Sequence, residues 1–323
     1  MVELAPAAST YAHPVVQLPA EMDRIVALAD GISREAFLAR VGGGIAHHEP
    51  TIGYRFADAI IADQTVYAGG SYRVVRAGRT RPVLLGAAEE LEDYLLATDW
   101  ACELFFGHWL TDGLSLELLA ERIGLKALGL ARQPWTQEPA YRRATQLAIR
   151  RAAHVHVRNL WTIANQGMND DRVARMRELR RRVRGSVNVR GGGKPVFLRR
   201  VAGATRTLAN QEALADALVR KGFDVLTPET EPVERLCATL AGARLVVSVE
   251  GSALCHAVVA MVEGGTILAI QPPERVNWIQ KAWCDCAGLR FAQTVADPAG
   301  GAFTVGEDRL FRLIDLIDRE NPI

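Results

Sequence analysis

Residues 245–261 read LVVSVEGSALCHAVVAM, and within this stretch the pattern changes from that of one element to that of another. Leu245 to Val249 form a short apolar run rich in valine, which is typical of a buried strand. From Ser252 onward the residues are small or apolar over a length that favours a helix. Glu250 and Gly251 stand between the two. The stretch therefore predicts a buried strand, a tight turn and a helix in direct succession.

The same alternation continues on both sides of this stretch. Strands are expected at 195–200, 223–228, 244–251, 266–273 and 289–295, with helices at 208–222, 231–243, 252–265 and 275–288 between them. Strands that alternate with helices of this length pair in parallel through right-handed crossovers. The C-terminal half is therefore predicted to be an α/β, Rossmann-like layer with a parallel sheet. An amphipathic helix is expected at 306–320.

The N-terminal half has a less regular pattern. Residues 64–86 predict two or three antiparallel strands with glycine turns, 107–124 a helix and 125–130 a strand. Two further helices are expected at 138–153 and 171–185, and the second contains seven arginines between Arg172 and Arg184. The glycine-rich run at 185–195 is a candidate hinge. We expect an N-terminal α/β domain over 1–190, a Rossmann-like domain over 191–304, and a C-terminal helix, 305–323, that could pack back on the N-terminal domain.

Composition excludes several classes of protein. The 323 residues are 49% hydrophobic and 23% charged, as in globular proteins, and the formal net charge of +1 argues against a general binder of nucleic acid. We expect no secretory signal and no membrane-spanning segment. The five cysteines are scattered and odd in number, which favours a reduced compartment. We therefore expect a cytoplasmic protein, at most peripheral at the inner membrane.

The turn at Glu250 lies where parallel sheets bind ligands, beyond the carboxyl ends of the strands. Gly251 and Ser252 come at the expected start of a helix, where unpaired backbone N–H groups favour an anion. In the alternative interpretation, Ser252 is an N-cap and Gly251 only a turn residue. The stretch by itself leaves both interpretations open.

Three arginines favour an anionic ligand at the same edge. Arg199 and Arg200 end the first strand of the predicted sheet, and Arg206 lies in the loop that opens the next helix. Three guanidinium groups could neutralise a diphosphate without a metal ion. Taken singly, each is more often a surface arginine, but together at this edge they predict a diphosphate site.

The residues from Val196 to His256 resemble glycosyltransferase family 61, including its bacterial polysaccharide-type members. That family has an arginine-rich turn after a strand, then an Asn-Glu pair, a G-F-x-V strand, and a His-Gly-Ala/Ser-x-Leu motif. The matching residues are Arg199, Arg200, Arg206, Asn210 and Glu212, then Gly222, Phe223 and Val225, then Ala243 and Arg244, and finally Gly251, Ser252, Ala253, Leu254 and His256. Gln211 intervenes where the family has Asn next to Glu. A second motif, at His108, Trp109, Asp112 and Leu114, resembles the family's His-Trp/Phe-x-x-Asp-x-Leu.

The resemblance implies a two-domain, GT-B-like enzyme with its nucleotide-sugar donor on the C-terminal domain. It implies an inverting, metal-independent transfer to a glycan or lipid-linked acceptor, in surface polysaccharide assembly. Arg199, Arg200, Arg206, Asn210, Gly251, Ser252 and His256 would then bind the donor. The sequence departs from the family at Glu250, which stands where the family has His. That change raises the alternative of a catalytically inactive protein that only binds nucleotide sugars.

Candidates for the catalytic base are His108, with Asp112 four residues later on the same helical face, and Glu250. In the alternative interpretation, His108 is a surface residue and Asp112 a carboxylate at a helix start. No Asp-x-Asp motif is present, so we expect no metal and no cofactor besides the donor, a UDP-sugar in the simplest case. A nicotinamide-dependent epimerase is disfavoured because no Gly-x-Gly-x-x-Gly follows a strand. We expect no nucleic-acid partner.

Overall fold

The computed structural model describes residues 1–76, 88–165, 167–190, 192–201 and 206–320. The chain divides into two compact units. The first unit contains Met1–Ser9 and His47–Arg182, and the second contains Thr10–Ala46 and Val183–Ile323. The segment Thr10–Ala46 thus belongs with the C-terminal half, whereas the sequence assigned all of 1–190 to one N-terminal domain.

The second unit is built on a parallel sheet with the strand order β12-β11-β13-β14-β15. The bounds of the strands are β11 Val196–Leu198, β12 Asp224–Leu226, β13 Leu245–Val249, β14 Thr266–Gln271 and β15 Arg290–Val295. Each predicted strand of the C-terminal half is present, and all the pairings are parallel. Every residue of β13 and β14 is buried, as their apolar composition requires for strands covered on both faces.

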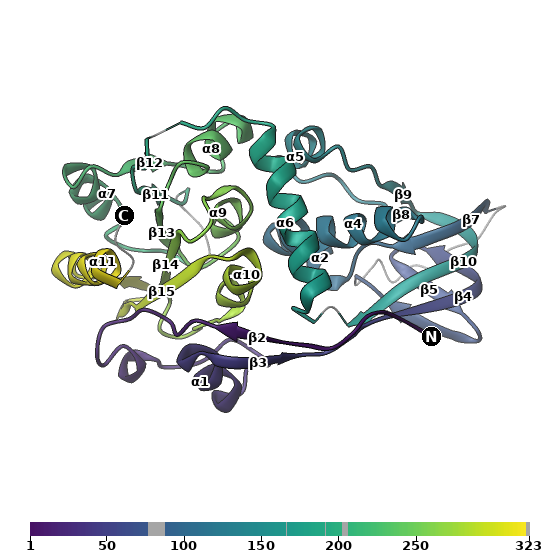
Figure 1. Cartoon of the computed structure of the whole chain (residues 1–323), viewed down its shortest axis with the longest axis horizontal. Helices are drawn as coiled ribbons and strands as arrows, with labels where there is room; N and C mark the ends of the chain where they lie inside the picture. Colours follow the sequence, from purple (N-terminus) through teal and green to yellow (C-terminus); the bar gives the residue numbers. More distant parts are fainter. Residues whose placement is uncertain (77–87, 166, 191, 202–205, 321–323) are drawn as a thin grey trace. The chain divides into compact units, whose positions relative to one another are not determined.

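Helices cover both faces of this sheet (Figure 1). Helices α7 and α11 lie on one face, and α8, α9 and α10 on the other. Their bounds are α7 Gln211–Arg220, α8 Val233–Leu240, α9 Leu254–Ala260, α10 Ile279–Ala287 and α11 Glu307–Glu320. Leu313 and Ile317 of α11 are buried with Phe197 and Leu268 of the sheet. The apolar face of the C-terminal helix is therefore buried within the second unit, and the expectation that it could pack on the N-terminal domain is corrected.

The segment Thr10–Ala46 extends the second unit at the β15 edge. It contains a 3₁₀ turn, Met22–Arg24, and the helix α1, Arg34–Gly42. The amide of Val16 donates to the carbonyl of Phe291, and the amide of Gln293 donates to the carbonyl of Val16. Further on, Leu28 pairs in parallel with Val276. Nothing in the local pattern of this segment indicated these partners, because they lie more than 240 residues away. The short hairpin β16 Asp297–Ala299 and β17 Ala302–Thr304 completes the unit.

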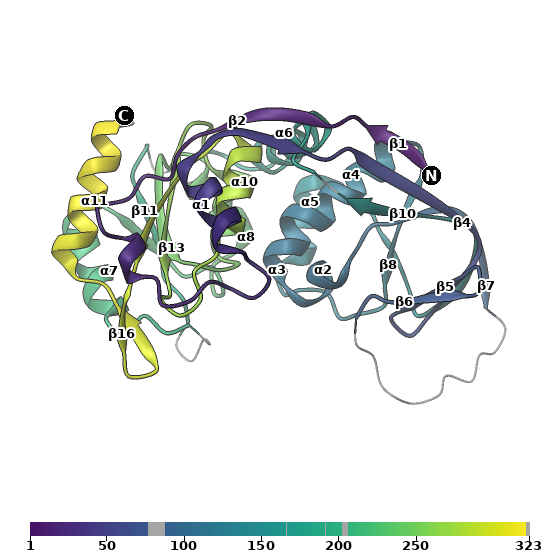
Figure 2. The same ribbon diagram turned by 90° about the horizontal axis from the view of Figure 1, so that it is seen from below.

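The first unit has a mixed sheet with the strand order β6-β5-β4-β10-β7-β8-β9, and β1 also pairs with β4. The bounds of these strands are β1 Val2–Ala5, β4 Thr51–Ala62, β5 Thr65–Ala68, β6 Ser71–Val74, β7 Glu89–Leu96, β8 Lys126–Leu130, β9 Arg150–Ala152 and β10 His154–Asn165. Strands β4, β5 and β6 are antiparallel (Figure 2), as the glycine turns predicted. The rest of the predicted antiparallel region, 77–86, lies outside the described residues.

Strand β10 joins two kinds of pairing, antiparallel to β4 and parallel to β7. Strands β7, β8 and β9 are also parallel to one another. The helices of this unit are α2 Trp100–Leu104, α3 Phe106–His108, α4 Leu114–Arg122, α5 Glu138–Thr145 and most of α6 Asp170–Gly185. Two further short strands, β2 Ala8–Ala12 and β3 Gly44–His48, pair with each other, and each has residues in both units. Because β7 and β8 run in parallel, the segments that follow them start at the same edge of the sheet.

The structure confirms only the first half of one predicted helix. The sequence predicted a helix over 138–153, but α5 ends at Thr145 and residues 150–152 form β9. Gln146 adopts a left-handed conformation with φ of 57° and ends the helix. Arginine is a good helix former, so the strand pairing of 150–152 with β8 overrides the local helix propensity of these residues.

Candidate active site

A buried carboxylate lies directly after β13, at the carboxyl edge of the parallel sheet in the second unit. The Glu250 side chain is 3% exposed and accepts hydrogen bonds from three donors. Arg206 donates to Glu250 Oε2, Arg275 Nη1 lies 3.3 Å from the same oxygen, and Gln280 Nε2 lies 3.0 Å from Oε1. These donors come from three separate segments, which follow β11, follow β14 and begin α10. Glu250 therefore ties together the loops of this edge.

The charges around Glu250 do not cancel. One carboxylate faces two guanidinium groups, and their side chains remain 25% exposed at Arg206 and 48% exposed at Arg275. Each guanidinium group carries five N–H donors, so both keep donors that one carboxylate cannot satisfy. The edge thus has fixed positive charge that faces solvent, which is the requirement for binding an anion.

Gly251 allows Arg206 to come this close. Its φ of 148° lies in a region that side chains with a Cβ rarely adopt. A Cβ built at this position would also lie 3.3 Å from Nη2 of Arg206. The conformation therefore requires glycine, and a Cβ at this position would also make the guanidinium of Arg206 shift by a few tenths of an ångström.

Arg200 adds a third positive charge near Arg206. Its Nη1 donates to the backbone carbonyl of Arg206 at 3.5 Å. Burial lowers the pKa of the Arg200 guanidinium, and the positive charge of Arg206 lowers that pKa further. The side chain of Gln211 brackets the Arg200 backbone, since Oε1 accepts from its N–H at 2.9 Å and Nε2 donates to its carbonyl at 2.9 Å. Gln211, which interrupts the family's Asn-Glu pair, is thus a positioning residue.

Two predicted donor-binding residues have partners elsewhere. Arg199 Nη1 donates to Glu212 Oε2 at 2.8 Å, and its Nε donates to the hydroxyl of Thr227 at 3.2 Å. Asn210 Nδ2 donates to the carbonyl of Val305 at 2.8 Å, which links the start of α7 to the loop before α11. Of the predicted arginines, the structure therefore brings Arg200 and Arg206 together with Glu250 and engages Arg199 with a different pair of residues.

The end of the predicted motif is more buried than expected. Helix α9 begins at Leu254, so Ser252 lies in the turn before it and is half-buried. His256 is 2% exposed within α9, and burial lowers the pKa of its imidazole to about 3. His256 is therefore neutral at pH 7 and lies inside the fold, whereas Gly251 lies at the edge beside Arg206.

Two residues of this group were missed by the sequence interpretation. Arg275 was included in a predicted helix, and Gln280 was not considered. In the structure α10 begins only at Ile279, and Arg275 lies in the preceding loop. The signal that could have indicated Arg275 is its position, since it follows a buried strand and two prolines at the edge where parallel sheets bind ligands.

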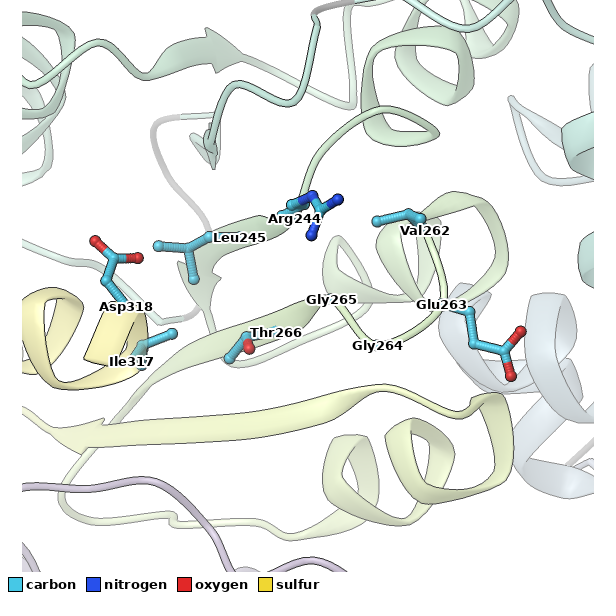
Figure 3. Close-up of a pocket in the computed structure, with 9 residues that line it drawn as sticks. All are labelled: Arg244, Leu245, Val262, Glu263, Gly264, Gly265, Thr266, Ile317 and Asp318. Atoms are coloured by element: carbon cyan, nitrogen blue, oxygen red, sulfur yellow. The ribbon is translucent and has the colours of Figure 1, made fainter. Parts of the chain in front are cut away.

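A pocket on the same sheet lies at the amino-terminal ends of the strands, opposite the Glu250 group (Figure 3). It is lined by Arg244, Leu245 and Thr266, among others, and Leu245 and Thr266 are the first residues of β13 and β14. Ligands of open parallel sheets bind at the carboxyl ends of the strands. The Glu250 group is at that end, and this pocket is not.

In the first unit, the predicted pair His108 and Asp112 is formed. His108 Nδ1 lies 2.7 Å from Asp112 Oδ2, and Asp112 Oδ1 accepts from Arg172, whose side chain is 1% exposed. A π-helical turn, Trp109–Gly113, carries Asp112, and such turns recur at functional sites. A buried cation thus holds the carboxylate that in turn orients the imidazole, while His108 itself is 27% exposed.

Three arginines of the arginine-rich helix α6 are buried, although more than half of the helix residues are exposed or half-buried. Arg172, Arg175 and Arg180 are at most 6% exposed, and Arg175 contacts Asp171 and Ser115. Arg182 pairs with Glu121, and the more exposed Arg181 pairs with Glu178. These arginines therefore stabilise the interior of the fold and the surface of α6 rather than forming a basic face.

Two kinds of feature are absent from the residues that the structure describes, namely a metal-binding cluster and a membrane-spanning helix. Within the described ranges, no three His, Cys, Asp or Glu side chains gather as they would to hold a metal ion. No helix in the described part of the chain has the length and apolar character needed to cross a membrane. The five cysteines are buried free thiols.

The family model described as Glycosyltransferase 61 matches residues 106–268, just over half of the chain. The matched region contains His108, Asp112, Arg206 and Glu250, and ends before Arg275 and Gln280. No curated protein matches the chain.

Proposed function

The chain belongs to glycosyltransferase family 61, and from this membership we propose that it transfers a sugar from a nucleoside-diphosphate donor to the hydroxyl of a glycan or glycoconjugate. The proposed reaction is inverting. The acceptor oxygen attacks the anomeric carbon, the bond from that carbon to the diphosphate breaks, and the nucleoside diphosphate leaves with the electron pair. We assign the donor to the Glu250 group.

The observation that carries the proposal is the set of guanidinium groups held around one buried carboxylate. Negative charge develops on the leaving diphosphate in the transition state, so fixed positive groups aimed at it lower the barrier. Arg206 and Arg275 are already anchored by Glu250. Little side-chain freedom is then lost when the donor binds. With Arg200 they supply the charge that a divalent metal supplies elsewhere, and we propose a metal-independent site.

His108 is our candidate for the base. Neutral imidazole takes protons well near pH 7, and the carboxylate of Asp112 stabilises the imidazolium that forms. Glu250, the other predicted candidate, has both carboxylate oxygens engaged with Arg206, Arg275 and Gln280. We therefore give Glu250 a positioning role in place of the family's His.

We further propose a GT-B-like enzyme with a UDP-sugar donor that acts in surface polysaccharide assembly in the cytoplasm. These finer assignments follow the family resemblance and the reduced cysteines, and each can be tested separately. Identification of the acceptor would test the polysaccharide assignment. Binding of a panel of nucleoside diphosphates would test whether uracil is the nucleobase of the donor.

The decisive experiment is UDP binding by calorimetry to the wild-type protein and to Arg206→Ala and Arg275→Ala. Loss of a charged hydrogen bond should weaken binding by about 1.5–3 kcal/mol in each variant. Arg235→Ala is the matched control, because Arg235 is an exposed arginine of the same unit that pairs with Glu231. Unchanged UDP affinity in both test variants would show that the donor does not bind at this site.

Turnover distinguishes the enzyme from the inactive alternative. Release of UDP from a UDP-sugar that depends on an added glycan acceptor supports transfer, whereas binding without release supports a nucleotide-sugar-binding protein. Inversion is tested by NMR of the product linkage, and metal independence by full activity in excess EDTA. Activity that disappears in EDTA and returns with Mg²⁺ would contradict a metal-independent site.

A further inference from the structure

Three large apolar side chains are exposed next to the candidate base. Trp100 is 56% exposed, and Leu104 and Phe105 are each 45% exposed. Trp100 and Leu104 are four residues apart on α2, so they share one face, and Phe105 follows at the end of the helix. We call these three residues the Trp100 patch. Burial of such side chains would stabilise the fold, so the exposure of three neighbouring ones calls for an explanation.

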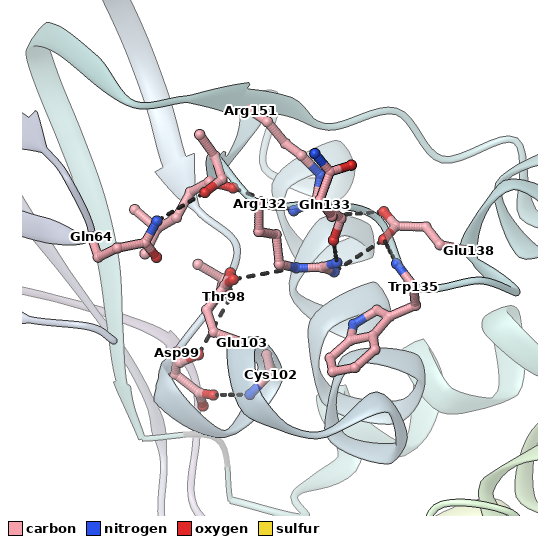
Figure 4. Close-up of polar contacts among 12 residues, drawn as sticks. Gln64, Thr98, Asp99, Cys102, Glu103, Arg132, Gln133, Trp135, Glu138 and Arg151 are labelled. Carbon is pink, nitrogen blue, oxygen red and sulfur yellow. Dashed lines mark hydrogen bonds and ion pairs between the residues drawn. The ribbon is translucent and has the colours of Figure 1, made fainter. Parts of the chain in front are cut away.

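The opposite face of α2 is firmly anchored, which makes the exposed face a fixed surface. Asp99 caps the helix by accepting from the amide of Cys102 at 2.8 Å. Glu103 is buried, accepts from the hydroxyl of Thr98 at 2.6 Å, and lies 3.2 Å from Nε of Arg132 (Figure 4). Because Thr98 and Arg132 follow β7 and β8, the sheet itself holds α2 with the Trp100 patch outward.

The patch continues directly into the candidate base. The rings of Trp100 and Phe105 meet edge to face with centroids 6.1 Å apart, and the rings of Phe105 and His108 lie 6.0 Å apart. An apolar aromatic surface therefore ends at an imidazole that is oriented by Asp112. A ligand on this surface needs an apolar face against the rings and a hydroxyl at the end nearest His108.

We propose that the Trp100 patch binds a sugar ring of the acceptor and presents its hydroxyl to His108. This inference rests on the proposed function. A pyranose ring has a face of C–H groups that packs on aromatic rings and a rim of hydroxyl groups for hydrogen bonds, so it meets both requirements. An acyl chain has no group for His108. An anionic lipid headgroup would need cations, yet the charged residue next to Trp100, at the start of α2, is the carboxylate Asp99.

The test uses a panel of methyl glycosides as probes: methyl α- and β-glucoside, galactoside, mannoside and xyloside. Protein labelled with 5-fluorotryptophan is titrated with each and followed by ¹⁹F NMR, and the Trp100 resonance is assigned by Trp100→Phe. We expect at least one glycoside to shift that resonance. Trp100→Ala and Phe105→Ala should weaken its binding about five- to tenfold, as expected for loss of one aromatic contact. Trp100→Phe should retain most of the affinity.

Tyr72→Ala is the matched control, because Tyr72 is an exposed aromatic of the same unit, on β6. UDP affinity measured on the same samples tests the proposed function separately, and we expect it to be unchanged in the patch variants. The inference is overturned if no glycoside moves the Trp100 resonance, or if Trp100→Ala and Tyr72→Ala bind the glycosides equally well. Loss of binding to anionic phospholipid vesicles in Trp100→Ala, with glycoside binding intact, would also overturn it.

Discussion

The guanidinium of Arg206 donates to the carboxylate of Glu250, although 44 residues separate them in the chain. Glu250 is inaccessible at the end of a buried strand, whereas Arg206 is partly exposed. The buried carboxylate therefore fixes the position of the arginine side chain, while part of the guanidinium group still faces solvent. Because Arg275 contacts the same oxygen, one buried residue sets the position of two cations.

Replacing Glu250 with Gln tests this positioning role. Without the carboxylate, Arg206 and Arg275 gain freedom that they must lose again when UDP binds. At about 0.5–1.5 kcal/mol for each immobilised side chain, the affinity for UDP should fall by about 1–3 kcal/mol. Calorimetry with UDP measures the effect. Tighter binding would instead show that Glu250 acts mainly as a repelling charge, and a loss of kcat with unchanged UDP affinity would restore it as the base.

Gly251→Ala should harm both stability and donor binding. The variant must hold Ala at a φ of 148°, which costs about 1–3 kcal/mol, and its methyl group would press on Arg206. We expect a lower Tm and weaker UDP binding. Gly264→Ala is the control, since Gly264 also has a positive φ of 77° but no atom within 4 Å of an added Cβ. If both variants lose stability and retain equal UDP affinity, the contact with Arg206 is irrelevant to the donor.

Asp112→Asn should lower turnover without changing donor binding. The amide removes the charge that orients His108 and stabilises its protonated form, so we expect kcat to fall about 100-fold or more. UDP affinity should stay within twofold. Asp112→Glu, which keeps the carboxylate, should recover part of the rate. Full activity of Asp112→Asn, or an equal fall in the control Glu92→Gln at an exposed position, would contradict the role of the pair.

His256 predicts a pH dependence of stability. Burial lowers the pKa of its imidazole to about 3, whereas the unfolded chain has a pKa near 6.5. Below pH 6.5 the unfolded state therefore binds more protons than the folded state, and stability falls as the pH falls toward 3. Well below pH 6.5 the loss approaches about 1.4 kcal/mol for each pH unit.

Denaturant unfolding of the wild type and of His256→Gln at pH 7, 6, 5 and 4 measures this contribution. Glutamine does not titrate, so the variant should lose less stability than the wild type between pH 6 and pH 4. Parallel curves for the two proteins would show that His256 is not buried in its neutral form.

Local pattern was sufficient for the elements of the C-terminal half. Strands β11 to β15 and helices α7 to α11 were all predicted, because each strand is an apolar run bounded by turn residues and each helix has an apolar face of its own. The pattern failed at 146–153, where pairing with β8 converts the end of a predicted helix into a strand. It also gave no indication that Thr10–Ala46 joins the second unit, because hydrogen bonds to the edge of β15 leave no periodicity in that segment.

The candidate site shows the same division. Spacing four apart on a helix was enough to pair His108 with Asp112, but not to find Arg172, which reaches Asp112 from another helix. Position at the strand ends was enough to select Arg200, Arg206 and Glu250. It could not distinguish Arg199 from its neighbour, because adjacent residues at a strand end point to opposite sides and only their partners reveal which one faces the ligand.

The sequence by itself determined the parallel sheet and the residue types at the carboxyl ends of its strands, because these follow from local periodicity and from the order of the strands along the chain. Only the tertiary structure decided that Glu250 anchors Arg206 and Arg275, that His256 is buried, and that Trp100 stays exposed beside His108. Those outcomes depend on contacts between segments that are distant in the chain, and the energy of such contacts appears only once the segments are packed together.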